Sequence, residues 1–169
     1  EGIGSTFWFH IPFALATSTT ENTDPTADTA ATIAMRKGAI LLVEDNPVNQ
    51  LLAVAMLTKY GHHVDIAEDG EQALRLLSSH AYDLVLMDCQ MPVMDGYEAT
   101  RRLRASDSSA LNPRIPVIAM TASALVEDQH RCFAAGMDGF ISKPVKAEDL
   151  QQAIVRLLET HPPTPPQHP

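Results

Sequence analysis

The sequence predicts an α/β protein built on a parallel sheet with helices on both faces. Short apolar runs that suit buried strands alternate with longer segments that carry apolar residues at helical spacing. Five strands that alternate with five helices in this way indicate a parallel sheet covered by helices. Several of the strands end in polar residues, and a parallel arrangement would bring these residues to one edge of the sheet.

Apolar runs bounded by turn residues mark the strands. Leu84 to Met87 is typical of a strand buried on both faces of a parallel sheet, and it ends in Asp88. Val64 and Ile66 mark a second, less apolar strand. The remaining runs are 39–43, ending in Glu44 and Asp45; 115–120, ending in Thr121; and 139–141, ending in Ser142, Lys143 and Pro144.

Capping residues mark the helices. Asn46 followed by Pro47 is typical of a helix start, and Gly61 of a helix end. Asp69 opens a second helix, and Asp95 with Glu98 fits a capping box that opens a third, to about residue 105. A fourth helix spans about 125–135. The apolar residues at helical spacing are Leu51, Leu52, Ala55 and Met56 in the first helix, and Leu150, Ile154, Leu157 and Leu158 in the last.

The chain resembles the receiver domain of two-component response regulators, from about Gly38 to Glu159. Five separated elements carry the resemblance, in the family's order: Glu44-Asp45, Asp88, Thr121, Phe140 and Lys143-Pro144. The resemblance implies a flavodoxin-like (βα)5 fold with strand order 2-1-3-4-5. We therefore expect a receiver domain over residues 38–159.

The resemblance also implies a Mg²⁺ site. Asp45, Asp88 and the backbone carbonyl of Gln90 would be direct ligands, and Glu44 would act through a water molecule. Mg²⁺ prefers such oxygen ligands and often bridges carboxylates to a phosphoryl group. A cation would also relieve the repulsion between packed carboxylates. A dedicated Ca²⁺ loop is not expected, because no stretch has EF-hand spacing.

Asp88 is the expected phosphoacceptor, since a carboxylate can act as a nucleophile and form an acyl phosphate. Lys143 would place a charge beside the phosphoryl oxygens, and Thr121 would donate a hydroxyl proton to one of them. Thr121 and Phe140 would form a switch that reshapes the face made by the fourth helix, the last strand and the last helix. The resemblance makes the bond before Pro144 a candidate cis peptide. The fragment would catalyse only its own phosphorylation and dephosphorylation, so its status as an enzyme stays open.

The segments outside the predicted domain suggest a larger parent protein. Residues 1–16 contain Gly-x-Gly-Ser-Thr-Phe-Trp-Phe and resemble the last glycine box and final strand of histidine-kinase ATP-binding domains. The alternative is that they are a cloning remnant or an apolar, adhesive tail. Residues 17–37 have the composition of a flexible linker, and the Pro-rich tail 160–169 is expected to be disordered. The end of a kinase domain, followed by a linker and then a receiver, is the order expected of a hybrid sensor histidine kinase.

Composition and missing motifs narrow the function. The net charge of −9 argues against binding to nucleic acid. No apolar span is long enough to cross a membrane, so we expect the fragment to be cytoplasmic and without membrane contact, even if the parent kinase is membrane-anchored. Cys89 and Cys132 are interpreted as reduced, buried thiols. A P-loop is absent, and Gln90 stands where a haloacid-dehalogenase-like phosphatase needs a second Asp.

Two functions follow from the sequence. In the first, the parent kinase's phosphohistidine phosphorylates Asp88, which then passes the phosphoryl group to a histidine phosphotransfer protein or domain. In the second, the domain docks on the kinase core and inhibits it independently of phosphorylation. The sequence leaves the input signal, the oligomeric state and the lifetime of the acyl phosphate open.

Overall fold

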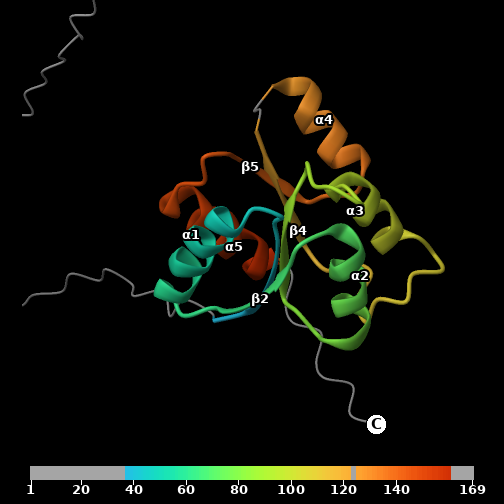
Figure 1. Ribbon diagram of the computed structural model, residues 1–169, viewed down its shortest axis with the longest axis horizontal. Helices are drawn as coiled ribbons and strands as arrows, with labels where there is room; N and C mark the ends of the chain where they lie inside the picture. The colour runs from blue at the N-terminus through green and yellow to red at the C-terminus, as the bar shows by residue number, and fades with distance from the viewer. Residues whose placement is uncertain (1–36, 123–124, 161–169) are drawn as a thin grey trace, which may run out of the picture. The chain divides into compact units, whose positions relative to one another are not determined.

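The computed structural model describes residues 37–122 and 125–160 (Figure 1). The predicted kinase remnant at 1–16, residues 17–36 of the predicted linker and residues 161–169 of the predicted tail lie outside the described residues. Thr160, which the sequence analysis places in the tail, instead ends the last helix. Among the described residues, no helix is both long and apolar enough to cross a bilayer.

Strands and helices alternate along the described chain, as predicted. The strands are β1 (Ala39–Val43), β2 (His63–Ala67), β3 (Leu84–Asp88), β4 (Val117–Thr121) and β5 (Gly139–Ser142). The helices are α1 (Pro47–Lys59), α2 (Gly70–Ser79), α3 (Gly96–Arg104), α4 (Val126–Ala134) and α5 (Ala147–Thr160).

The five strands form one parallel sheet in the order β2-β1-β3-β4-β5. This is the flavodoxin-like order implied by the resemblance, and it is confirmed. The register places Asp88 opposite Met120, and Thr121 opposite Ser142. The polar residues that follow these strands therefore meet at the carboxyl edge of the sheet.

The sheet is covered on both faces (Figure 1). One core contains Ile40 and Leu42 of β1 with residues from α1 and α5. The other contains Leu41 and Val43 of the same strand with residues from α2, α3 and α4. Because neighbouring strand residues point to opposite faces, a strand buried on both faces reads as a continuous apolar run.

The predicted helix caps are present in the structure. The side chains of Asn46, Asp69 and Asp95 accept hydrogen bonds from first-turn amides of α1, α2 and α3. Gly61 and Gly136 follow helices with φ of 85° and 93°, a conformation that glycine adopts without a steric cost. The three side-chain caps fix where α1, α2 and α3 start beside the sheet edge.

The predicted apolar stripe of α1 is wrong. Ala53 and Leu57 are the buried residues of this helix, whereas Leu51 and Leu52 are 74% and 50% exposed. Apolar residues surround most of this helix, so its sequence offers two possible buried faces. The small side chain of Ala53 and the larger one of Leu57, four residues apart, form the face that packs on the sheet.

Candidate functional site

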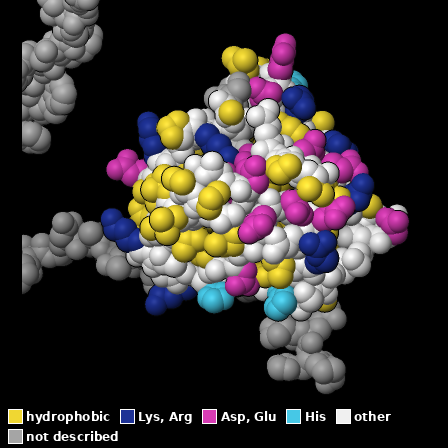
Figure 2. Space-filling model, viewed as in Figure 1, with side chains coloured by type: hydrophobic (Ala, Val, Ile, Leu, Met, Phe, Trp, Pro, Cys, Tyr) yellow, Lys and Arg dark blue, Asp and Glu magenta, His cyan; other side chains and the backbone are white. Residues whose placement is uncertain are grey.

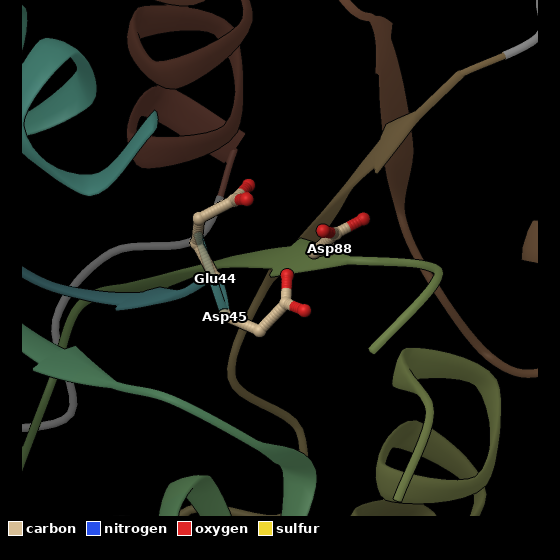
Figure 3. A group of neighbouring side chains, drawn as sticks. All are labelled: Glu44, Asp45 and Asp88. Carbon is tan, nitrogen blue, oxygen red and sulfur yellow. The ribbon is translucent and has the colours of Figure 1, made fainter. Parts of the chain in front are cut away.

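Three carboxylates meet at the carboxyl ends of β1 and β3 (Figure 3). Glu44 and Asp45 directly follow β1, and Asp88 is the last residue of β3. Each contributes an oxygen that lies within 4.8 Å of the other two. Glu44 and Asp88 are only 2% and 4% exposed, while Asp45 faces solvent. The cluster predicted from separate strand ends is therefore assembled by the fold.

Lys143 connects two of these carboxylates. Its Nζ lies 2.6 Å from Glu44 Oε2 and 2.6 Å from Asp88 Oδ2. The second oxygen of Asp88 accepts a hydrogen bond from the backbone amide of Gln90, at 3.1 Å. The chain turns sharply after Lys143 through a cis peptide bond to Pro144, the isomer that the resemblance implies.

Burial and ion pairing shift the pKa values of Asp88 and Lys143. Desolvation raises the pKa of Asp88 above its usual value, although hydrogen bonds from Lys143 and the Gln90 amide and the charge of Lys143 act against this shift. Desolvation would lower the pKa of Lys143, but its hydrogen bonds and ion pairs with Asp88 and Glu44 outweigh burial, so this pKa is raised. Lys143 is consequently a stable cation between two acids.

The first turn of α1 also takes part in the site, which the sequence interpretation missed. Asn49 Nδ2 donates to Glu44 Oε1 at 2.8 Å, and Gln50 Nε2 donates to the backbone carbonyl of Glu44 at 2.7 Å. The helix start at Asn46 was recognised from sequence. Extending that helix by one turn would have placed residues 49 and 50 over the end of β1.

A cleft of about 240 Å³ opens above the carboxylates. It is lined by residues from four strand ends and the start of α1, and all of them except Ala122 carry a charge or an amide: Glu44, Asp45, Asn46, Asn49, Asp88, Gln90, Ala122 and Lys143. The cleft can admit a small anionic group beside Asp88, with the ammonium of Lys143 at its wall.

The two predicted switch residues lie farther along the sheet. Thr121 ends β4 and is 5% exposed, and the backbone amide of Lys143 donates to its carbonyl at 2.7 Å. Phe140 is partly buried on β5, and its ring lies edge-on to that of Phe133 with centroids 6.2 Å apart. This ring contact joins β5 to α4, and Phe133 on α4 is half exposed.

Cys89 and Cys132 are free and buried, as the sequence suggested. Their sulfur atoms are 3.9 Å apart. Burial raises the pKa of Cys89 to about 12, and the charge of the neighbouring Cys132 adds to this effect. Cys89 therefore stays protonated, and both residues pack behind the site.

Residues 40–155 match the family model of the response regulator receiver domain. The chain belongs to this family. It is 40% identical over 145 residues to Histidine kinase 5 of Arabidopsis thaliana, covering 72% of this chain and 16% of that protein. It is 35% identical over 166 residues to Hybrid signal transduction histidine kinase K of Dictyostelium discoideum, covering 92% and 13%. The receiver chain thus spans a small part of the curated relatives it matches.

A solved receiver structure agrees with this assignment. The receiver domain of sensor histidine kinase PA1611 from Pseudomonas aeruginosa PAO1 is 45% identical, with a TM-score of 0.66 over 73% of this chain and 99% of that one. That structure was determined with a magnesium ion coordinated in its active site cleft. The chain is therefore a response regulator receiver domain, and the relatives and the solved structure above are histidine kinases or their receiver domains.

Proposed function

We propose that Asp88 of this receiver accepts a phosphoryl group from a phosphohistidine. The observation that supports this most strongly is the ammonium of Lys143, held 2.6 Å from a buried Asp88 oxygen within the cleft. In the transfer, an Asp88 oxygen bonds to phosphorus as the phosphorus–nitrogen bond of the donor breaks. Lys143 then leaves its contact with Asp88 and pairs with an oxygen of the transferred group, and the Thr121 hydroxyl donates to another.

The acidic cluster fits Mg²⁺. Its donors are all oxygen atoms, and three carboxylates with one lysine leave two negative charges, which a divalent cation balances. Asp45, Asp88 and the backbone carbonyl of Gln90 would hold the ion, with Glu44 acting through water. When bound, the ion supplies neutralisation of the charge that gathers around phosphorus.

The exposed face of α1 supports a helical donor domain as the phosphohistidine partner. Val48, Leu51 and Leu52 are 72%, 74% and 50% exposed, and hydrophobic side chains gather over this helix in Figure 2. The same helix begins at the rim of the cleft. An amphipathic helix of a donor that packs on this stripe would bring its histidine to Asp88. We define these three residues as the α1 patch.

The parent protein is proposed to be a hybrid histidine kinase. The relatives above are histidine kinases, and the chain covers 13–16% of their lengths. In this proposal residues 1–16 end the kinase ATP-binding domain, residues 17–37 form the linker, and the receiver works in the cytoplasm. A histidine phosphotransfer protein or domain would be the next acceptor.

Phosphotransfer and inhibitory docking can be separated with three substitutions. Transfer from a phosphorylated histidine domain should be lost in Asp88→Asn, because the amide lacks the carboxylate nucleophile that forms the acyl phosphate. Leu51→Ser should slow this transfer but leave phosphorylation by acetyl phosphate unchanged, since the small donor does not need the α1 patch. Kinase inhibition that persists in Asp88→Ala would support the docking function, whereas transfer that is unchanged in Asp88→Asn would contradict Asp88 as the acceptor.

A further inference from the structure

Glu44 is held by a donor at each of its acceptor groups. Its Oε1 accepts from Asn49 at 2.8 Å, its Oε2 from Lys143 at 2.6 Å, and its backbone carbonyl from Gln50 at 2.7 Å. The side chain is 2% exposed, so these donors replace the water that would otherwise solvate it. The orientation of this carboxylate therefore depends on Asn49 and Lys143 together.

Asn49 and Lys143 differ in the number of carboxylates that each side chain contacts. Lys143 also binds Asp88, at 2.6 Å, and a phosphoryl group on Asp88 would draw its ammonium away from Glu44. Asn49 stands on the first turn of α1, which is fixed by the Asn46 cap, and its amide has no charge that a phosphoryl group would attract strongly. Asn49 can thus keep its bond to Glu44 while Lys143 turns.

We propose that Asn49 is a positioning residue that holds the Glu44 carboxylate facing the acidic cluster, and that it thereby sets the affinity of the cluster for a divalent cation. This inference rests on the proposed function, because it takes the cluster to be the Mg²⁺ site. Asn49 acts through Glu44 and not by contact with the ion. Because Asn49 is an exposed residue, its replacement opens no cavity in the core. Partners that orient the groups around a metal site are known to affect metal affinity in this way.

The test is the dissociation constant of Mg²⁺, measured by calorimetry on the 169-residue chain. Asn49→Ala removes the amide, and Asn49→Leu keeps the approximate shape of Asn without its donor. Both should weaken Mg²⁺ binding roughly three- to tenfold, a smaller effect than the 10- to 100-fold typical for groups that contact metal ligands directly. The matched control is Gln50→Ala, which removes the neighbouring bond to the Glu44 backbone and should change the constant less than twofold.

A second readout follows phosphorylation by acetyl phosphate at several Mg²⁺ concentrations. The Asn49 variants should be slow at limiting Mg²⁺ and should approach the wild-type rate when Mg²⁺ is saturating. Affinities of both Asn49 variants within twofold of wild type would overturn the inference, as would an equal loss in Gln50→Ala. A wild-type chain that binds no Mg²⁺ and gains no phosphate would instead overturn the proposed function itself, so the two failures can be told apart.

Discussion

Burial of the Asp88 carboxylate carries a cost that can be measured without any partner. Desolvation raises its pKa in the folded protein, so the ionised form is less favourable there than in the unfolded chain. Asp88→Asn removes this charge and keeps the shape of the side chain. We expect the free energy of unfolding at neutral pH, without Mg²⁺, to rise by about 0.5–2 kcal/mol, the range of stabilising changes at strained functional positions.

The sign of the pH dependence follows from the same shift. The gain from Asp88→Asn should be complete above the raised folded-state pKa, shrink as the pH falls through that pKa, and vanish below the unfolded value of 3.8, where wild-type Asp88 is protonated in both states. Urea unfolding of both proteins over this pH range measures the effect. A difference that stays constant with pH would show that charge burial at Asp88 is not its cause.

At the scale of single residues, strand ends were sufficient to predict the acids but not their hydrogen bonds. Asp88 and the Glu44-Asp45 pair follow apolar runs, and a parallel sheet brings such positions together. The bond from Asn49 depends on how α1 leaves the sheet edge, which no local pattern specifies. Likewise, the contact of Lys143 with both Glu44 and Asp88 depends on strands far apart in the chain.

At the scale of elements, the packing of α3 against the end of β3 places Asp88. A Cβ atom on Gly96 would collide with the backbone carbonyl of Asp88, so the first residue of α3 has room only for glycine. Gly96→Ala should destabilise the fold by about 1–3 kcal/mol, as overpacking does. Thermal or urea unfolding measures this loss.

Gly139 on β5 is the matched control for that substitution. A Cβ atom there would meet Leu157 at 3.8 Å, which is ordinary van der Waals contact. Gly139→Ala should therefore leave the stability unchanged or increase it slightly, because alanine loses less conformational freedom on folding. Equal stability losses in the two variants would contradict the proposed close approach of α3 to β3.

Sequence patterns were sufficient to locate the elements but not to predict how each one packs. Capping residues located the helix starts, and apolar runs located the strands, because both depend on neighbours in the sequence. The buried face of α1 could not be chosen in this way. Its Leu51 and Leu52 are as apolar as Leu57, and only the position of the sheet decides which of them is buried.

At the scale of the whole molecule, the proposed switch links the cleft to the face formed by α4, β5 and α5. Phe140 now packs edge-on to Phe133, and Cys132 is the only residue of α4 that is buried. This sparse packing would let α4 and Phe140 rearrange when Thr121 is drawn toward a phosphoryl group. Such a coupling requires two states that differ by only a few kcal/mol.

Thr121→Ala tests that coupling. The variant should still accept phosphate at Asp88, because Lys143 and the acidic cluster are intact, but it should not repack the α4–β5–α5 face. Amide hydrogen exchange over residues 121–155, with and without beryllofluoride as a phosphoryl mimic, provides the measurement. The same changes in protection in wild type and variant would show that the Thr121 hydroxyl does not transmit the change.

The central claim, that Asp88 is the phosphoacceptor, is tested most directly by intact mass after incubation with acetyl phosphate and Mg²⁺. The wild-type chain should gain the mass of a single phosphoryl group, because Asp88 ends the central strand β3 beside both Lys143 and the Glu44-Asp45 pair. Asp88→Asn should gain none, although it folds. An equal mass gain in Asp88→Asn would contradict the assignment and place the phosphorylated residue elsewhere in the chain.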